Sequence, residues 1–136
     1  MNVVAKKLMG VERAMVTTGV AEDQSLASSF NKAARQWEWW IDHRLLRWWE
    51  SPSALEDDGL RPPPQKVIHE AIQQARNWRD AGAPAPSSIV PDGDGGITFE
   101  WRNGGFLSRV EILETLEVDL YIIRDGKLVQ QHRLTD

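Results

Sequence analysis

The segment PDGDGGITFEW, residues 91–101, brings two aspartates and three glycines together, and such residues can hold a metal ion or a phosphate group. A calcium loop beginning at Asp92 would place Ile97 where the loop needs glycine and Asn103 where it needs a bidentate glutamate. A phosphate loop requires a lysine and a hydroxyl side chain after its glycines, and Ile97 follows them here. The segment therefore predicts a turn that precedes a strand, without a bound metal.

The three histidines do not form a metal-binding pattern either. His43, His69 and His132 are far apart in the sequence, and Gln73 stands where a zinc-protease helix beginning at His69 would need its second histidine. The chain contains no cysteine, which excludes disulfides, thiolate metal sites and a thiol nucleophile. We therefore predict no metal, no cofactor and no catalytic residue.

Acidic residues could still serve an enzyme. Glu100 and Glu111 fall on the outward-facing positions of predicted strands, where an antiparallel sheet normally carries charged side chains. The alternative to a non-enzymatic protein is a small enzyme or ligand-binding domain. Its pocket would lie between the sheet and a tryptophan-rich helix and would use His43, Glu100 and Glu111.

The tryptophan-rich segment WEWWIDHRLLRWWE, residues 37–50, is the most informative part of the chain. In a regular helix, one face would carry the core residues Trp37, Trp40, Ile41, Leu45 and Trp48. Trp39 and Leu46 would lie nearly opposite this face. Tryptophan and arginine are enriched in the residues that dominate protein interfaces. The predicted interface residues are Trp39, Arg44, Leu46, Arg47 and Trp49.

Two alternatives compete with the interface hypothesis for this helix. The helix could serve the core alone, with the second stripe covered by other parts of the chain. It could also lie on a membrane surface, which favours an excess of basic residues on the polar face. Here Glu38, Asp42 and Glu50 balance the charges of Arg44 and Arg47, so we predict no membrane contact.

The composition fits one small domain of 136 residues, with 26% charged and 41% hydrophobic side chains. The net charge of −4 argues against a nucleic-acid partner, because such proteins usually need a basic patch. No apolar stretch has the length of a signal-peptide core or a transmembrane helix. Together with the lack of cysteine, this predicts a cytoplasmic protein.

The positions of apolar residues predict a single α+β domain over 30–136, preceded by an N-terminal arm over 1–29. The tryptophan-rich helix occupies 30–50, and a connector over 51–64 is rich in proline and aspartate. A second helix follows over 65–81. From residue 88 to 134 the apolar period changes from 3.6 to 2, which predicts a four-stranded antiparallel β-meander packed on the two main helices.

Residues 61–134 resemble a group of small bacterial proteins of unknown function. The shared pattern is a proline-led helix, a proline-containing connector, the motif DGG-hydrophobic-x-hydrophobic-E-W and a hairpin with a glycine turn. The matching residues are Pro84, Pro86, Pro91, Asp94, Gly95, Gly96, Ile97, Phe99, Glu100 and Trp101. The resemblance implies the α+β fold of this part of the chain, and it implies no activity or site residue.

The sequence thus favours a non-enzymatic protein-interaction module of regulatory or antitoxin-like type. We expect it to self-associate through the tryptophan-rich helix as a homodimer, or to bind another protein through the same helix.

Overall fold

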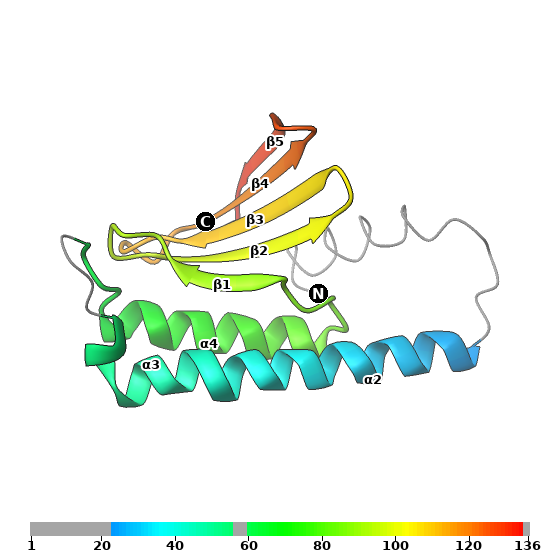
Figure 1. The fold of residues 1–136 in the computed structure, drawn as a ribbon, viewed down its shortest axis with the longest axis horizontal. Coiled ribbons are helices and arrows are strands. Elements are labelled where there is room, and N and C mark those ends of the chain that lie inside the picture. Colours follow the sequence, from blue (N-terminus) through cyan, green and yellow to red (C-terminus); the bar gives the residue numbers. More distant parts are fainter. Residues whose placement is uncertain (1–22, 56–59, 135–136) are drawn as a thin grey trace.

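The computed structural model describes residues 23–55 and 60–134, which form a helical layer and one antiparallel sheet (Figure 1). The helical elements are α2 (Asp23–Trp40), a π-helical turn η1 (Ile41–Leu45), α3 (Leu46–Glu50), a 3₁₀ turn η2 (Pro52–Leu55) and α4 (Gln65–Asp80). The strands are β1 (Ser88–Pro91), β2 (Ile97–Asn103), β3 (Phe106–Ile112), β4 (Val118–Arg124) and β5 (Lys127–Arg133). The α+β class and the antiparallel sheet predicted from the sequence are confirmed.

The sheet has five strands in the order β1-β2-β3-β4-β5, and not the predicted four. The additional strand is β1, which pairs with β2 through four residue pairs from Ser88–Glu100 to Pro91–Ile97. Only Ile89 of this strand is fully buried, and the neighbouring prolines resemble a connector. A strand this short has too few residues to show a period of 2, so the sequence pattern missed it.

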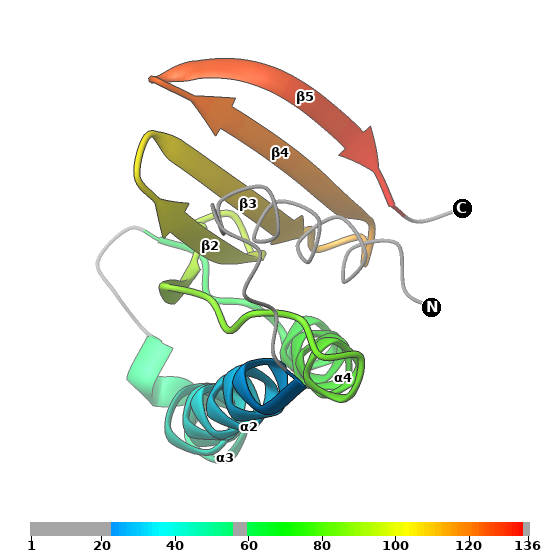
Figure 2. The same ribbon diagram turned by 90° about the vertical axis from the view of Figure 1, so that its right-hand side faces the viewer.

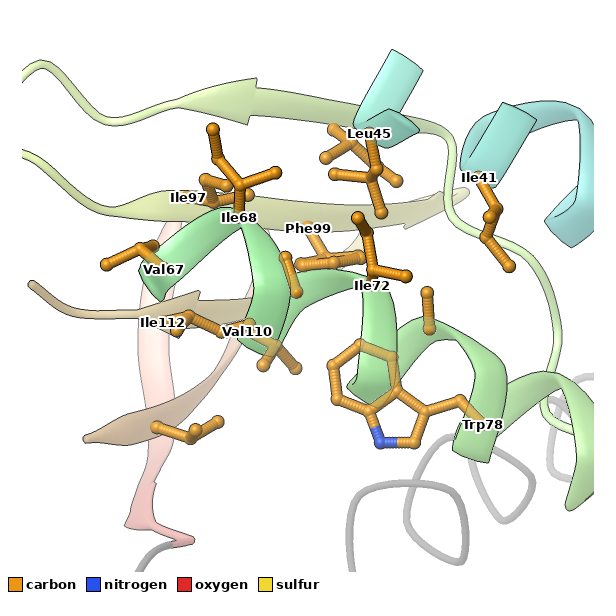
Figure 3. Close-up of a cluster of buried hydrophobic side chains, with 14 of the residues drawn as sticks. Ile41, Leu45, Val67, Ile68, Ile72, Trp78, Ile97, Phe99, Val110 and Ile112 are labelled. Carbon is orange, nitrogen blue, oxygen red and sulfur yellow. The ribbon is translucent and has the colours of Figure 1, made fainter. Parts of the chain in front are cut away.

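The helices cover one face of the sheet, near β1, β2 and β3, and β5 lies farthest from them (Figures 1 and 2). Helix α4 packs against β2 and β3, and Figure 3 shows Val67, Ile68 and Ile72 between the helix and the sheet. Ile97 and Phe99 of β2 face them, as the alternation of apolar residues predicted.

Within the described residues α2 begins at Asp23, so the end of the predicted N-terminal arm is helical. The remainder of that arm, residues 1–22, lies outside the described residues. At its C-terminal end α2 continues into the π-helical turn η1, where the Leu46 N–H donates a hydrogen bond to the Ile41 carbonyl. In a π-helical turn the backbone hydrogen bond joins residues five apart, whereas in an α-helix it joins residues four apart. The side chains after the turn therefore point in directions that differ from those in a regular α-helix.

Because of this rotation, the prediction for one interface residue is wrong. Leu46 was expected opposite the core face, together with Trp39, but it is partly buried and packs against the core cluster. The prediction assumed 100° per residue throughout, and the π-helical turn breaks that assumption. Leu46 is therefore a core-facing side chain.

Four aromatic rings form the centre of the core between the helices and the sheet. Trp37 of α2 lies 5.9 Å from Trp78 of α4, 6.3 Å from Phe99 and 6.1 Å from Trp101, measured between ring centroids. The indole N–H of Trp37 donates to the Ala83 carbonyl at 2.9 Å, and that of Trp101 donates to the Pro84 carbonyl at 2.8 Å. The cluster thereby holds the helices, the sheet and the loop after α4 together.

Asp92 shapes the loop between β1 and β2, whose aspartates and glycines suggested a metal or phosphate site. Its Oδ1 accepts hydrogen bonds from the backbone N–H groups of Asp94 at 2.7 Å and Gly96 at 2.9 Å. Gly93 and Gly95 both have φ of 88°, a conformation that glycine adopts without strain. The loop is therefore a turn stabilised by an aspartate side chain, as predicted.

Candidate functional site

A surface centred on Trp39 is the main candidate for a functional site. The side chain of Trp39 is 51% exposed, although it is large and apolar. It lies between two shallow hollows, one on the α2–α3 helix and the other against the loop that precedes β1. We call this region the Trp39 surface. It consists of Gln36, Trp39, Trp40, His43, Arg44, Arg47, Trp48, Ala85, Pro86 and Ser87.

Neighbouring rings hold Trp39 in place. Its ring meets the edge of Trp40 at a centroid distance of 5.0 Å and an interplanar angle of 88°, and His43 lies 5.4 Å away on the same helix. The indole N–H of Trp40 donates to the Pro86 carbonyl at 3.0 Å, which fixes Trp40 against the loop. An exposed aromatic ring that is already ordered loses less conformational entropy when it binds a partner.

Arg44 is ordered on the same surface. Its guanidinium carbon lies 5.5 Å from the ring centroid of Trp40 and 5.8 Å from that of Trp48. Cation–π contacts of this kind restrict the guanidinium and leave its donors available to a partner. The surface therefore presents an apolar ring next to positive charge on a rigid helix.

The structure brings together three of the five predicted interface residues. Trp39, Arg44 and Arg47 share the hollow on the helix, together with His43, which the sequence had suggested only for a pocket. Leu46 faces the core, as described above. Trp49 is 37% exposed, but it packs against His69 of α4 at 5.8 Å and does not line either hollow. The spacing of four residues between Trp39, His43 and Arg47 could have identified His43 as a member of this surface.

The predicted pocket of His43, Glu100 and Glu111 is not formed. Glu100 lies between the buried residues Phe99 and Trp101 of β2, so it points away from the helices. Glu111 alternates with buried residues of β3 in the same way and also faces outward. His43 lies on the helical layer, so the sheet separates it from both carboxylates.

The outward face of the sheet carries paired charges. Glu100 accepts hydrogen bonds from Arg102 at 3.2 Å and from Arg109 at 3.3 Å, which ties β2 to β3. Burial raises the pKa of Glu111, and the negative charges of Asp92 and Asp119 raise it further, whereas the charge of Arg109 partly opposes these effects. Glu111 therefore has the electrostatic environment of a partly desolvated carboxylate in a charged sheet surface.

Replacing Glu111 by glutamine is expected to stabilise the protein at pH 7. A raised pKa means that the folded state binds the proton more tightly than the unfolded chain, so ionised Glu111 weighs against folding at neutral pH. The benefit should shrink as the pH falls and should vanish near about pH 3, where the carboxyl group is protonated in both states. Urea denaturation of the wild type and Glu111→Gln at both pH values measures this. A variant that is less stable than the wild type at pH 7 would contradict the assigned environment.

The described residues contain no group of three or more histidines, aspartates or glutamates arranged to hold a metal ion. The absence of a metal site in the whole protein remains a prediction. In the part of the chain that the structure describes, no helix has both the length and the apolar character needed to cross a membrane.

The fold and the Trp39 surface together define a class of protein. It is an α+β domain in which helices cover one face of an antiparallel five-stranded sheet, with an aromatic and basic surface on the helical layer. Comparison of the chain with protein-family models, with curated proteins and with solved structures gave no match. The function is therefore inferred from the surface itself.

Proposed function

We propose that this protein is a non-enzymatic interaction module that binds protein through the Trp39 surface and self-associates through it. The supporting observation is Trp39, a tryptophan that is 51% exposed and packs against the rings of Trp40 and His43. We further propose a regulatory or antitoxin-like role in the cytoplasm, a compartment that suits a chain without cysteine.

The chemistry of the Trp39 surface supports a protein partner over a small ligand. Both hollows are shallow and open, whereas small-molecule sites are usually concave and enclose most of the ligand. Tryptophan and arginine are enriched among the few residues that dominate a protein interface, and truncating such a dominant residue costs about 2 kcal/mol or more of binding free energy. Trp39 with Arg44 and Arg47 provides such a combination.

Replacing Trp39 by glutamate is expected to shift the protein toward the monomer without unfolding it. A carboxylate at the centre of the contact would be desolvated on association, and the exposed position tolerates a polar side chain in the monomer. Sedimentation equilibrium of the wild type and the variant over a range of concentrations measures the change in mass.

Trp49→Glu is the matched control, because Trp49 is partly exposed on the same run of helix but does not line the hollows of the Trp39 surface. It should retain the wild-type mass. If Trp39→Glu keeps the same mass as the wild type at every concentration while remaining folded, the proposed contact is wrong. If the wild type is monomeric even at high concentration, self-association is wrong.

A further inference from the structure

The ionisable side chains that line the Trp39 surface are all basic. His43, Arg44 and Arg47 line the hollow on the helix, and neither hollow is lined by an aspartate or a glutamate of the described chain. The same run of helix also carries three acidic side chains, which are exposed and line neither hollow: Glu38, Asp42 and Glu50. The surface therefore offers positive charge beside an exposed aromatic ring.

The two arginines of this surface have no anionic partner among the described residues. Other arginines in this part of the chain form ion pairs with carboxylates: Arg61, Arg79, Arg102, Arg109 and Arg133. Arg44 instead lies against the rings of Trp40 and Trp48, a contact that does not use its N–H donors. Such a guanidinium can bind a carboxylate of a partner through two parallel hydrogen bonds.

We propose that the Trp39 surface binds an acidic segment of a partner protein that also carries an apolar anchor. A carboxylate of this segment binds Arg44 and Arg47, and a neighbouring apolar side chain packs on Trp39. This inference rests on the proposed function, because it specifies the chemistry of the protein that the surface binds. A second copy of this chain would compete with the acidic segment for the same surface.

The second hollow accounts for the apolar anchor. Its lining includes the rings of Trp39 and Trp40 and the side chain of Pro86. The indole N–H of Trp40 already donates to the Pro86 carbonyl, so it is not needed by a ligand. Burying an apolar side chain here is favourable, whereas burying a second charge without a partner is costly. The two hollows thus require different side chains from one segment.

The net charge of the whole chain, −4, does not oppose an acidic partner at this position. At physiological ionic strength the Debye length is about 8 Å, so exposed charges farther from the contact than this are largely screened. The attraction is therefore set by the side chains in and beside the hollow and not by the net charge. For the same reason, added salt should weaken the contact.

A random peptide library displayed on phage tests the chemistry of the partner directly. The library is selected on the intact protein and again on Trp39→Glu, and only sequences that the wild type alone retains are considered. We expect these sequences to be enriched in acidic and large apolar residues relative to the unselected library. Basic or uncharged sequences would overturn the inference. Sequences that match a segment of this chain would assign the surface to a second copy instead.

The tightest of these peptides is then titrated against variants of the protein. Trp39→Ala should weaken binding by about 30-fold, as expected for a dominant interface residue. Arg47→Gln should weaken it by about 2–5-fold, and the double variant with Arg44→Gln by about tenfold. Raising the salt concentration from about 0.05 to about 0.5 M should weaken binding to the wild type more than to the double variant.

Arg35→Gln is the matched control for the arginine variants. Arg35 is an exposed arginine of α2 that lines neither hollow, so its loss should leave the affinity for the peptide unchanged. An equal effect of Arg35→Gln and Arg47→Gln would show that the peptide responds only to overall charge, and this would overturn the assigned site. The urea midpoint of each variant verifies that it is folded.

Two further outcomes separate this inference from the proposed function. If binding of the peptide requires Trp39 but the double arginine variant binds as tightly as the wild type, the acidic partner is wrong and the Trp39 surface still binds protein. If no selected peptide depends on Trp39, the inference is wrong, and the sedimentation measurement on Trp39→Glu decides self-association independently.

Discussion

Replacing Trp37 by alanine is expected to lower the free energy of unfolding by about 3–5 kcal/mol. The side chain is fully buried and contacts three other aromatic rings, so its removal leaves a cavity at the junction of helices and sheet. It also leaves the Ala83 carbonyl without its indole donor. Small domains have a total stability of about 5–15 kcal/mol, so this change removes a large part of it.

Trp39→Ala is the matched control for this first prediction, because it removes the same side chain two positions further along the same helix. Trp39 is half exposed, and substitutions at exposed positions usually change stability by about 0.5 kcal/mol or less. Urea denaturation at low protein concentration compares the two variants. Equal losses for both variants would show that the helix presents a different face to the core.

Trp101→Ala is expected to destabilise the protein by a similar amount, about 3–5 kcal/mol. Trp101 stacks at 6.2 Å on Phe99 and contacts Trp37 and Trp78, and its indole N–H binds the Pro84 carbonyl. Trp101→Phe separates these contributions, because it keeps a ring and removes the donor. We expect this variant to recover most of the loss, at a residual cost of about 1–3 kcal/mol for the unpaired carbonyl and the smaller ring.

Thermal or urea denaturation of the Trp101 variants provides the measurement. An unchanged midpoint for Trp101→Ala would mean that the register of β2 is reversed. Because Trp37 and Trp101 are in contact, their alanine variants should not be additive, and the double variant should cost less than the sum of the single changes. Additive losses would indicate that the four rings do not act as one cluster.

The sequence predicted the elements that have strong periodicity. The alternation of Ile97, Phe99 and Trp101 correctly placed these side chains in the core, because a strand with one buried face must alternate. The helix expected over 65–81 is α4, Gln65–Asp80, whose apolar residues recur at helical spacing. The turn at Asp92 was also correct, since its residue types match no ligand-binding loop.

The features that the sequence missed depend on contacts between segments that are distant in the sequence or on a local change of helical geometry. Strand β1 is defined by its pairing with β2, and four residues carry too little periodicity to reveal it. The π-helical turn has no residue signature in the sequence, and it moved Leu46 from the predicted interface to the core side. The pocket of His43 and the two glutamates is a different case, because the alternation itself places Glu100 and Glu111 on the sheet face opposite the buried apolar side chains, away from the helices.

The open edge of β5 affects how this protein behaves in concentrated solution. This strand pairs with β4 alone, no described residue pairs with its other edge, and its Leu128 and Val129 are more than half exposed. An unprotected edge is a template on which further extended chains can add, and this is how fibrous aggregates grow. Lys127 provides positive charge at one end of the strand, which opposes such stacking of identical copies. At the other end Arg133 pairs with Glu117 and Asp119, so its charge is balanced. Salt screens this repulsion, so high ionic strength is expected to favour aggregation through the β5 edge.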